Sequence, residues 1–290
     1  MVAGSAVLHV AWNVRLKSAG DPLTAAAIGL GVGALVIVPV GTAVWWLGGA
    51  EPLPVAGLAL GLVSGLIEAV YFFLLAGAYR RGDLSVVYPI ARGTAPLILV
   101  AVGVGLLGER LGTAGWIGVA CLIAGFLALQ RPWVALHSAL TGRRRPGGPG
   151  PIAFAVATGV AIAAYTTVDR VGTRLIDPVP YAGLIWLSGS VALGIGAVVA
   201  GRTHGWRDPD VARPAAVGGL LTLGAYPLVL FALSVAPLTA VAPLRESATV
   251  VAAAWGAVRM GEAVSRGDAT RRIVASAVIV AGAILLAVDA

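Results

Sequence analysis

Ten long apolar runs dominate the chain and limit what it can fold into. Most of them approach or exceed the roughly 20 residues that an α-helix needs to cross about 30 Å of hydrocarbon. Apolar and polar residues do not alternate along them, and open strand edges are not tolerated in lipid, so helices are the expected form. The sequence therefore predicts an all-α, polytopic membrane protein with ten transmembrane helices. The runs cover residues 1–14, 24–47, 53–79, 84–107, 113–130, 151–176, 180–200, 212–234, 238–258 and 271–289.

The composition agrees with this class. Hydrophobic residues make up 59% of the chain and charged residues 11%, which is far from the balance of soluble globular domains. The net charge of +7 would favour a nucleic-acid partner in a soluble chain. Here we assign it to membrane orientation and anionic lipid, and we expect no nucleic-acid partner and a location in the cell membrane. Cys121 is the only cysteine, which excludes an internal disulfide.

The basic residues are distributed unevenly between the connections that join the runs. Fifteen of the 20 lysine and arginine residues lie in the first, third, fifth, seventh and ninth connections. The positive-inside rule places these connections in the cytoplasm and both termini outside. The first run starts at Met1 without a basic leader or a cleavage site, so we interpret it as a short first helix, with the true start of the chain left open.

The chain divides into two halves that resemble each other. The basic, Gly/Pro-rich stretch 131–150 has the composition of a linker, and it separates residues 1–130 from residues 151–290, with five runs in each. Asn13, Asp21 and Pro22 match Asp169, Asp177 and Pro178 at an offset of 156. The stretch 84–93 matches 238–247 at an offset of 154. Because five is odd, the second half enters the membrane in the opposite direction, which predicts two inverted five-helix repeats.

Four charged residues fall well inside the runs, namely Glu68, Arg92, Arg245 and Glu246. A charge at a helix centre costs roughly 2.5–3.5 kcal/mol on insertion scales, so such residues need a structural or functional reason. Arg92 could bridge Glu68 or Glu246 as a structural tie, or the charges could line a cavity that binds a polar solute or carries protons. Both roles are compatible. A nearby arginine would oppose the raised pKa that a proton-carrying Glu68 requires.

Helical spacing places Gly57, Gly61, Gly65 and Glu68 on one stripe, which predicts close contact with a neighbouring helix.

Two further groups of polar residues lie at matching depths of the first and sixth runs. The first run has His9, Trp12 and Asn13 on one face, and the sixth has Tyr165 and Asp169. They could line the same cavity. Alternatively, Trp12 is an interfacial residue, His9 packs against a neighbour and Asp169 pairs with an arginine at the end of its helix.

Catalytic motifs are missing from the sequence. It contains three histidines and no HExxH, GxSxG or GxxxxGK[ST] pattern. We therefore expect no enzyme activity, metal or cofactor. A membrane-embedded enzyme, a lipid-processing protein and a non-transporting scaffold remain as alternatives.

Several stretches resemble the EamA-type branch of the drug/metabolite transporter superfamily. They are "LHVAWNVRLK" (8–17), "RRGDLSVVYPIARGTAPL" (80–97), "LLGERL" (106–111), "LTAVAPLRESATV" (238–250) and "GEAVS" (261–265). The resemblance implies two EamA repeats around a substrate cavity and the export of amino acids, metabolites or toxic compounds by alternating access, often in exchange for protons. It leaves the substrate, the transport direction and the oligomeric state open. The positions that could line the cavity are His9, Trp12, Asn13, Glu68, Tyr71, Tyr88, Arg92, Tyr165, Asp169, Tyr226, Arg245 and Glu246.

Overall fold

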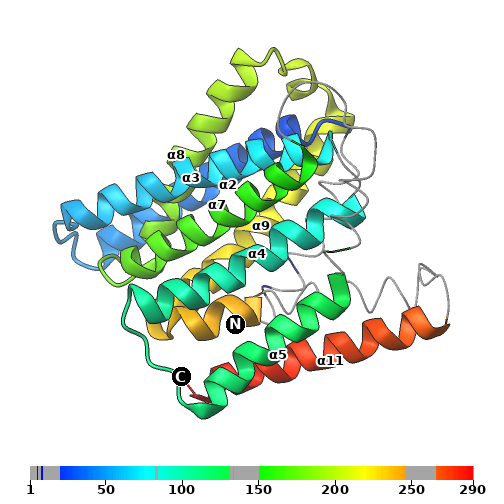
Figure 1. Cartoon of the computed structure of the whole chain (residues 1–290). Helices are drawn as coiled ribbons and strands as arrows, with labels where there is room; N and C mark the ends of the chain where they lie inside the picture. The colour runs from blue at the N-terminus through cyan, green and yellow to red at the C-terminus, as the bar shows by residue number, and fades with distance from the viewer. Residues whose placement is uncertain are drawn as a thin grey trace. The chain divides into compact units, whose positions relative to one another are not determined.

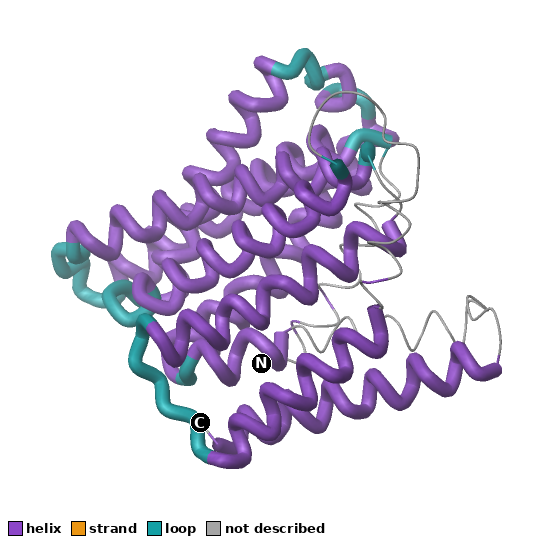
Figure 2. The backbone as a smooth tube through the Cα atoms, in the orientation of Figure 1, coloured by secondary structure: helices purple, strands orange, loops and turns teal. Residues whose placement is uncertain are grey.

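Helices are the only regular secondary structure in the described part of the chain. The structure is a computed structural model that describes residues 20–81, 84–130, 150–245 and 266–289, together with Ser5, Leu8 and Trp133. Figure 2 shows helices and short connections and no strand among these residues. The helices, labelled in Figure 1, are α2 (Pro22–Leu47), α3 (Val55–Tyr79), α4 (Leu84–Gly105), α5 (Thr113–Gln130), α7 (Pro151–Gly172), α8 (Pro178–Val199), the short η1 (His204–Trp206), α9 (Pro209–Val235) and α11 (Arg266–Asp289).

Five of the described helices, α2, α3, α7, α8 and α9, are long and apolar enough to cross a membrane. Their outward faces carry large apolar side chains, such as Leu35 and Ile195, which are 78% and 60% exposed. Such exposure suits a protein whose surroundings are hydrocarbon. The predicted all-α membrane protein is confirmed, whereas the number of ten spans stays a prediction.

Asp-Pro pairs explain where three helices begin. Proline is favoured in the first turn, where its missing N–H group is not needed, and a preceding aspartate can accept a bond from the next free amide. Asp21 does so with the amide of Leu23 (3.2 Å), and Asp208 with that of Asp210 (3.0 Å). Asp177, at the start of α8, makes no side-chain capping bond. The helices α2 and α9 therefore start a few residues before the apolar runs that predict them.

The described chain forms two compact units, and each takes helices from both halves of the sequence. Unit 1 comprises Met1–Ala76 and Ala164–Val235, and unit 2 comprises Gly77–Ala163 and Ala236–Ala290. The compact units are therefore a different division from the predicted repeats, which follow one another along the chain.

In unit 1, α2 packs against α8 and α9. Gly33 faces the indole of Trp186, and Gly41, later on α2, faces Pro180 at the start of α8, so the two helices run antiparallel. They lie side by side in Figure 1. The predicted contact of the glycine stripe is also confirmed, because three glycines of α3 pack against α8 and the turn before it. These are Gly57, Gly61 and Gly65.

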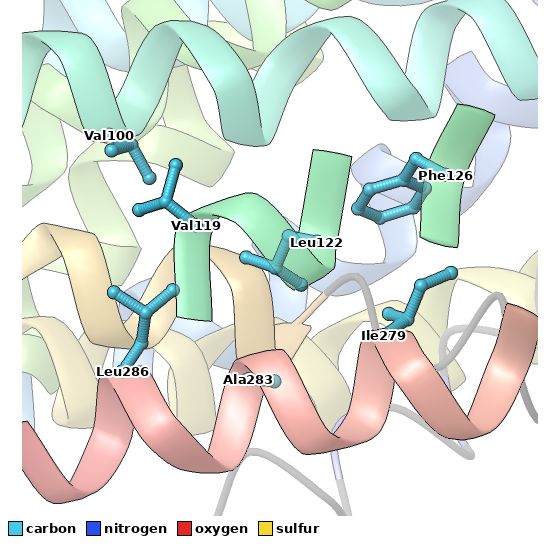
Figure 3. Packing of buried hydrophobic residues seen from close by; sticks show 7 residues of the cluster. All are labelled: Val100, Val119, Leu122, Phe126, Ile279, Ala283 and Leu286. Atoms are coloured by element: carbon cyan, nitrogen blue, oxygen red, sulfur yellow. The ribbon is translucent and has the colours of Figure 1, made fainter. Parts of the chain in front are cut away.

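In unit 2, α5 and α11 form the corresponding antiparallel pair. Gly112, just before α5, donates its amide to Asp289 at the end of α11 (2.6 Å), and Arg271 near the start of α11 bonds to the carbonyl of Ala128. Figure 3 shows the core between these helices and α4. Its buried members are Val100, Val119, Leu122, Phe126, Ile279, Ala283 and Leu286.

A carboxylate from the first half caps a helical segment of the second half within unit 2. Gly108 has a positive φ of 68°, which turns the chain so that Glu109 can reach the helical residues 238–245. The Glu109 carboxylate accepts the amides of Leu238 (2.6 Å) and Thr239 (2.9 Å). These amides belong to the first helical turn and have no partner inside their own helix, so the capping stabilises this helix start.

Candidate functional site

Asp169 on α7 is the centre of a buried polar cluster in unit 1. Its side chain is 0% exposed. Tyr181 from α8 donates its hydroxyl to one carboxylate oxygen at 3.1 Å, and Tyr226 from α9 donates to the other in a short hydrogen bond. Three helices therefore meet at one carboxylate. Hydrogen bonds of this kind to an ionised group are among the stronger ones in proteins.

Aromatic rings extend this cluster in a chain of edge-to-face contacts. Tyr71 lies 6.0 Å from Tyr165, Tyr165 lies 5.9 Å from Tyr226, and Trp186 lies 6.1 Å from Tyr226, measured between ring centroids. Tyr71 also contacts Phe72 at 4.9 Å. These separations fall in the range that aromatic pairs favour. The result is an aromatic surface beside a carboxylate.

A second carboxylate, Glu68 on α3, belongs to the same region. It is 9% exposed and acts electrostatically on the hydroxyl of Tyr181. Arg170, a candidate partner of Asp169 in the sequence, donates to the carbonyl of Leu233 (2.9 Å). We refer to Glu68, Tyr71, Tyr165, Asp169, Tyr181, Trp186 and Tyr226 as the Asp169 cluster. Buried carboxylates next to aromatic faces are a suitable environment for an organic cation.

Five of the predicted site residues come together in this cluster, namely Glu68, Tyr71, Tyr165, Asp169 and Tyr226. Arg92 and Arg245 lie in unit 2, where they are 6% and 5% exposed. Tyr88 lies on α4, and its side chain is outside the described part. His9, Trp12, Asn13 and Glu246 also lie outside the described residues. A bridge from Arg92 to Glu68 or Glu246 stays a prediction.

Two members of the cluster were not predicted as site residues. Tyr181 lies in the first turn of α8, and only the turn at 173–177 that reverses the chain brings it to Asp169. Trp186 is 1% exposed and packs inside unit 1 against Gly33 and the ring of Tyr226. One sequence signal could have found Tyr181, namely its position one turn after the repeated Asp-Pro pair.

A pocket of about 620 Å³ opens at one end of unit 1, between the starts of α2 and α9. We call it the α2–α9 pocket. A network of polar contacts crosses its rim: Arg202 pairs with Asp21 at 2.9 Å, and Thr24 donates to either Asp21 (2.9 Å) or the carbonyl of Arg202 (3.0 Å). Phe72 contributes to the lining. The described lining also includes Asp208, Asp210, Leu30, Ala215, Gly218 and Thr222.

The ion pair at the rim sets the ionisation of Asp21. Burial by itself would raise the pKa of Asp21, but the hydrogen bond and charge of Arg202, with hydrogen bonds from Thr24 and the Leu23 amide, hold it below its ordinary value of 3.8. A carboxyl group whose pKa is lowered by folding contributes stability above its unfolded value, and this contribution is lost as the pH falls through the folded value.

We expect Asp21→Asn to lower the melting temperature of the purified protein slightly at pH 7, because asparagine retains the helix cap and loses only the charge. The two side chains are 35% and 29% exposed, so the loss should stay below about 1 kcal/mol. The difference from the wild type should disappear at a pH below the lowered pKa. Melting curves in detergent at the two pH values test this, and a pH-independent difference would contradict the assignment.

A helical membrane fold with a buried polar cluster is compatible with a membrane transporter, and comparison with known families supports this class. The model of the EamA-like transporter family matches residues 1–130 and 150–288, so the chain belongs to this family. It is a multi-pass protein of the cell membrane. A solved crystal structure that is 20% identical shares the fold, with a TM-score of 0.70 over 99% of this chain and 95% of the other.

Curated relatives match shorter parts of the chain. The spermidine export protein MdtI of Shigella flexneri is 37% identical over 70 residues, which are 24% of this chain and 64% of that protein. The protein of the same name from Salmonella paratyphi B is 32% identical over 97 residues, which are 29% of this chain and 89% of that protein. The chain thus matches less than two thirds of the Shigella protein.

Proposed function

We propose that the protein is a secondary active transporter of ten helices, built from two inverted five-helix repeats at 1–130 and 151–290 that are joined by the linker 131–150. A twofold axis in the membrane plane would make each helix antiparallel to its counterpart in the other repeat. The pairs α2 with α8 and α5 with α11 are such counterparts, and both run antiparallel where they pack. A repeat inserted in the same direction would make them parallel.

Individual contacts in unit 1 support the same axis. The offset of 156 relates Leu30 to Trp186 and Gly33 to Gly189. Gly33 packs against Trp186, and the symmetry-related contact of Gly189 with Leu30 is also present.

In a second pair of equivalent contacts, the residues on one side are related by the offset of 156 and those on the other side by the offset of 154. Gly219 on α9 packs against the backbone of Gly29, and Gly65 on α3 packs against the backbone of Ile185. The offset of 156 relates Gly29 to Ile185, and that of 154 relates Gly65 to Gly219. The two glycine contacts are therefore equivalent positions of the proposed repeats.

We propose further that the transporter exports a small metabolite, amino acid or toxic compound by alternating access. The observation that carries this proposal is the buried Asp169 cluster, in which two carboxylates lie beside aromatic rings inside the helical bundle. Buried charge of this kind in a membrane protein favours a solute or ion pathway. The cluster suits a solute with an amino group, in keeping with the spermidine named for the relatives.

The proposed binding site keeps all the predicted positions, with Arg92 and Arg245 as groups that could bind the carboxylate of a zwitterion and Glu246 as a further acid that could bind an amino group. Protons are the proposed coupling ion, and Asp169 and Glu68 are the described carboxylates that could carry them. No oligomeric state is proposed. Transport is favoured over catalysis because the family model that matches both halves of the chain is that of a transporter family.

Reconstituted liposomes test the proposal. Purified protein should drive the movement of a radiolabelled solute from a panel of amines, amino acids and toxic cations when a proton gradient is imposed, and should stop when the gradient is collapsed. Movement equal to that in protein-free liposomes for the whole panel would refute the transport function. Movement that ignores the gradient would refute only the proton coupling.

A further inference from the structure

The α2–α9 pocket lies at an end of unit 1 where the two proposed repeats differ in their side chains. At the other end of the α2 and α8 pair, Ile176 is 3% exposed and fills the space against Gly57. The offsets of 156 and 154 relate Ile176 to Gly20 and Gly57 to Val211. A glycine therefore replaces the isoleucine that closes the equivalent space, and the pocket stays open.

Glycine also leaves the wall of the pocket open. Among the described residues, a Cβ atom placed on Gly20 or on Gly218 would meet no atom within 4 Å, although Gly218 is buried. The next residue, Gly219, is in tight contact with α2. The pocket is thus a space bordered by packed helices, and its volume of about 620 Å³ lies within the range of small-molecule sites.

The chemistry of the lining is acidic at the rim and apolar below. Asp21, Asp208 and Asp210 oppose a single basic residue, Arg202, among the described lining residues. Asp208 and Asp210 are exposed, so their charges can attract a ligand from solution. The deeper lining consists mainly of small and apolar side chains, among them Leu30, Phe72, Val211, Pro214 and Ala215.

Phe72 connects the pocket to the buried cluster. Its ring lines the pocket and also contacts Tyr71, which contacts Tyr165. Tyr165 in turn contacts Tyr226, whose hydroxyl bonds to Asp169. A continuous series of aromatic side chains therefore leads from the pocket to the carboxylate of the proposed transport site.

We propose that the α2–α9 pocket is a second binding site, which receives small organic cations with an apolar body before they reach the Asp169 cluster. The carboxylates at the rim attract the cationic group, and the apolar wall with Phe72 accepts the body of the ligand. The proposal rests on the proposed transport function for its role as an entry site. Binding in the pocket is measurable without transport.

Filling the pocket is the first test. Gly218→Leu places a side chain into it, and Gly194→Leu is the matched control, because Gly194 is also a helical glycine without atoms near its Cβ position and lies outside the pocket. Equilibrium binding of radiolabelled tetraphenylphosphonium to detergent-purified protein should weaken at least roughly tenfold in Gly218→Leu and stay within about twofold of the wild type in Gly194→Leu, since a filled site loses its contacts with the ligand. Equal binding by both variants would overturn the proposal.

Removing the rim charges is the second test, and it does not depend on whether Gly218→Leu folds. The double variant D208N/D210N keeps the helix cap and removes two charges, and Glu51→Gln removes one exposed charge outside the pocket. We expect the double variant to bind tetraphenylphosphonium roughly threefold or more weakly at low salt, and the difference to shrink as salt screens the charges. If the double variant bound tetraphenylphosphonium as tightly as the wild type at low salt, the proposed attraction of the ligand by the rim carboxylates would be wrong.

The variant Asp169→Asn allows the pocket proposal and the transport proposal to be tested independently of each other. If it abolishes transport while Gly218→Leu leaves both tetraphenylphosphonium binding and the transport KM unchanged, the protein is a transporter and the pocket site is wrong. If the wild type moves no solute but binds tetraphenylphosphonium in a manner that Gly218→Leu weakens, the pocket site holds and the transport function is wrong.

Discussion

We expect Gly219→Ala to remove most of the folded protein, whereas Gly218→Ala, one residue earlier on α9, should leave the yield nearly unchanged. A Cβ atom at Gly219 would enter the backbone of Gly29 on α2, where its nearest neighbours are the carbonyl group and the Cα atom. Backbone atoms cannot move aside by a change of rotamer, so the two helices would have to separate. Overpacking in a core typically costs about 1–3 kcal/mol, and a contact between two backbones should reach or exceed the upper value.

Gly218→Ala is a closely matched control because the change in helix propensity is the same and no described atom lies near its Cβ position. Gly65→Ala, at the equivalent position of the other proposed repeat, should be as damaging as Gly219→Ala, since its Cβ would meet the backbone of Ile185 and Gly189. Size-exclusion profiles and melting temperatures of fluorescently tagged variants measure the effect. Equal profiles for Gly218→Ala and Gly219→Ala would show that α2 and α9 are not packed in this way.

The second large effect is expected from Asp169→Asn, which should abolish transport and leave the protein folded. Asparagine preserves the size of the side chain and one acceptor oxygen, but it removes the charge and presents an NH₂ group to one of the two tyrosine hydroxyls. A hydrogen bond to a charged group contributes about 1.5–3 kcal/mol. A bound amine that loses this contact should bind roughly ten- to a hundredfold more weakly.

Asp177→Asn is the control for Asp169→Asn, because Asp177 is a carboxylate of the same unit that makes no side-chain capping bond. Tyr181→Phe and Tyr226→Phe should each reduce transport less than Asp169→Asn does, since either leaves the carboxylate in place. Initial rates in liposomes and melting temperatures provide the two readouts. Normal transport by a well-folded Asp169→Asn protein would remove this carboxylate from the proposed mechanism.

The helices could be predicted from the sequence because hydrocarbon demands long apolar runs, and the runs end where Asp-Pro pairs and glycines allow turns. Periodicity also placed Glu68 on the glycine stripe that packs against α8. Asp169, which the repeat offset relates to Asn13, is completely buried in unit 1, and its role in a binding site stays a prediction.

The features of the site that could not be predicted from the sequence depend on how the helices pack against one another. The hydroxyl of Tyr181 reaches Asp169 only because the chain reverses between α7 and α8, and no sequence pattern fixes that direction. We attribute the α2–α9 pocket to the missing side chain at Gly20, which is recognised only by comparison with Ile176, the counterpart that fills the space against Gly57. Pairing between Arg92 and the glutamates stays a prediction.

The position of Trp186 gives the Asp169 cluster its own optical reporter. The indole is 1% exposed, its ring lies beside Tyr226, and its N–H group makes no hydrogen bond within the described part of the chain. Indole emission shifts in wavelength when water or a charged molecule comes near. Subtracting the spectrum of a Trp186→Phe variant from that of the wild type would therefore isolate a signal that follows hydration of the cluster in real time, without any attached dye.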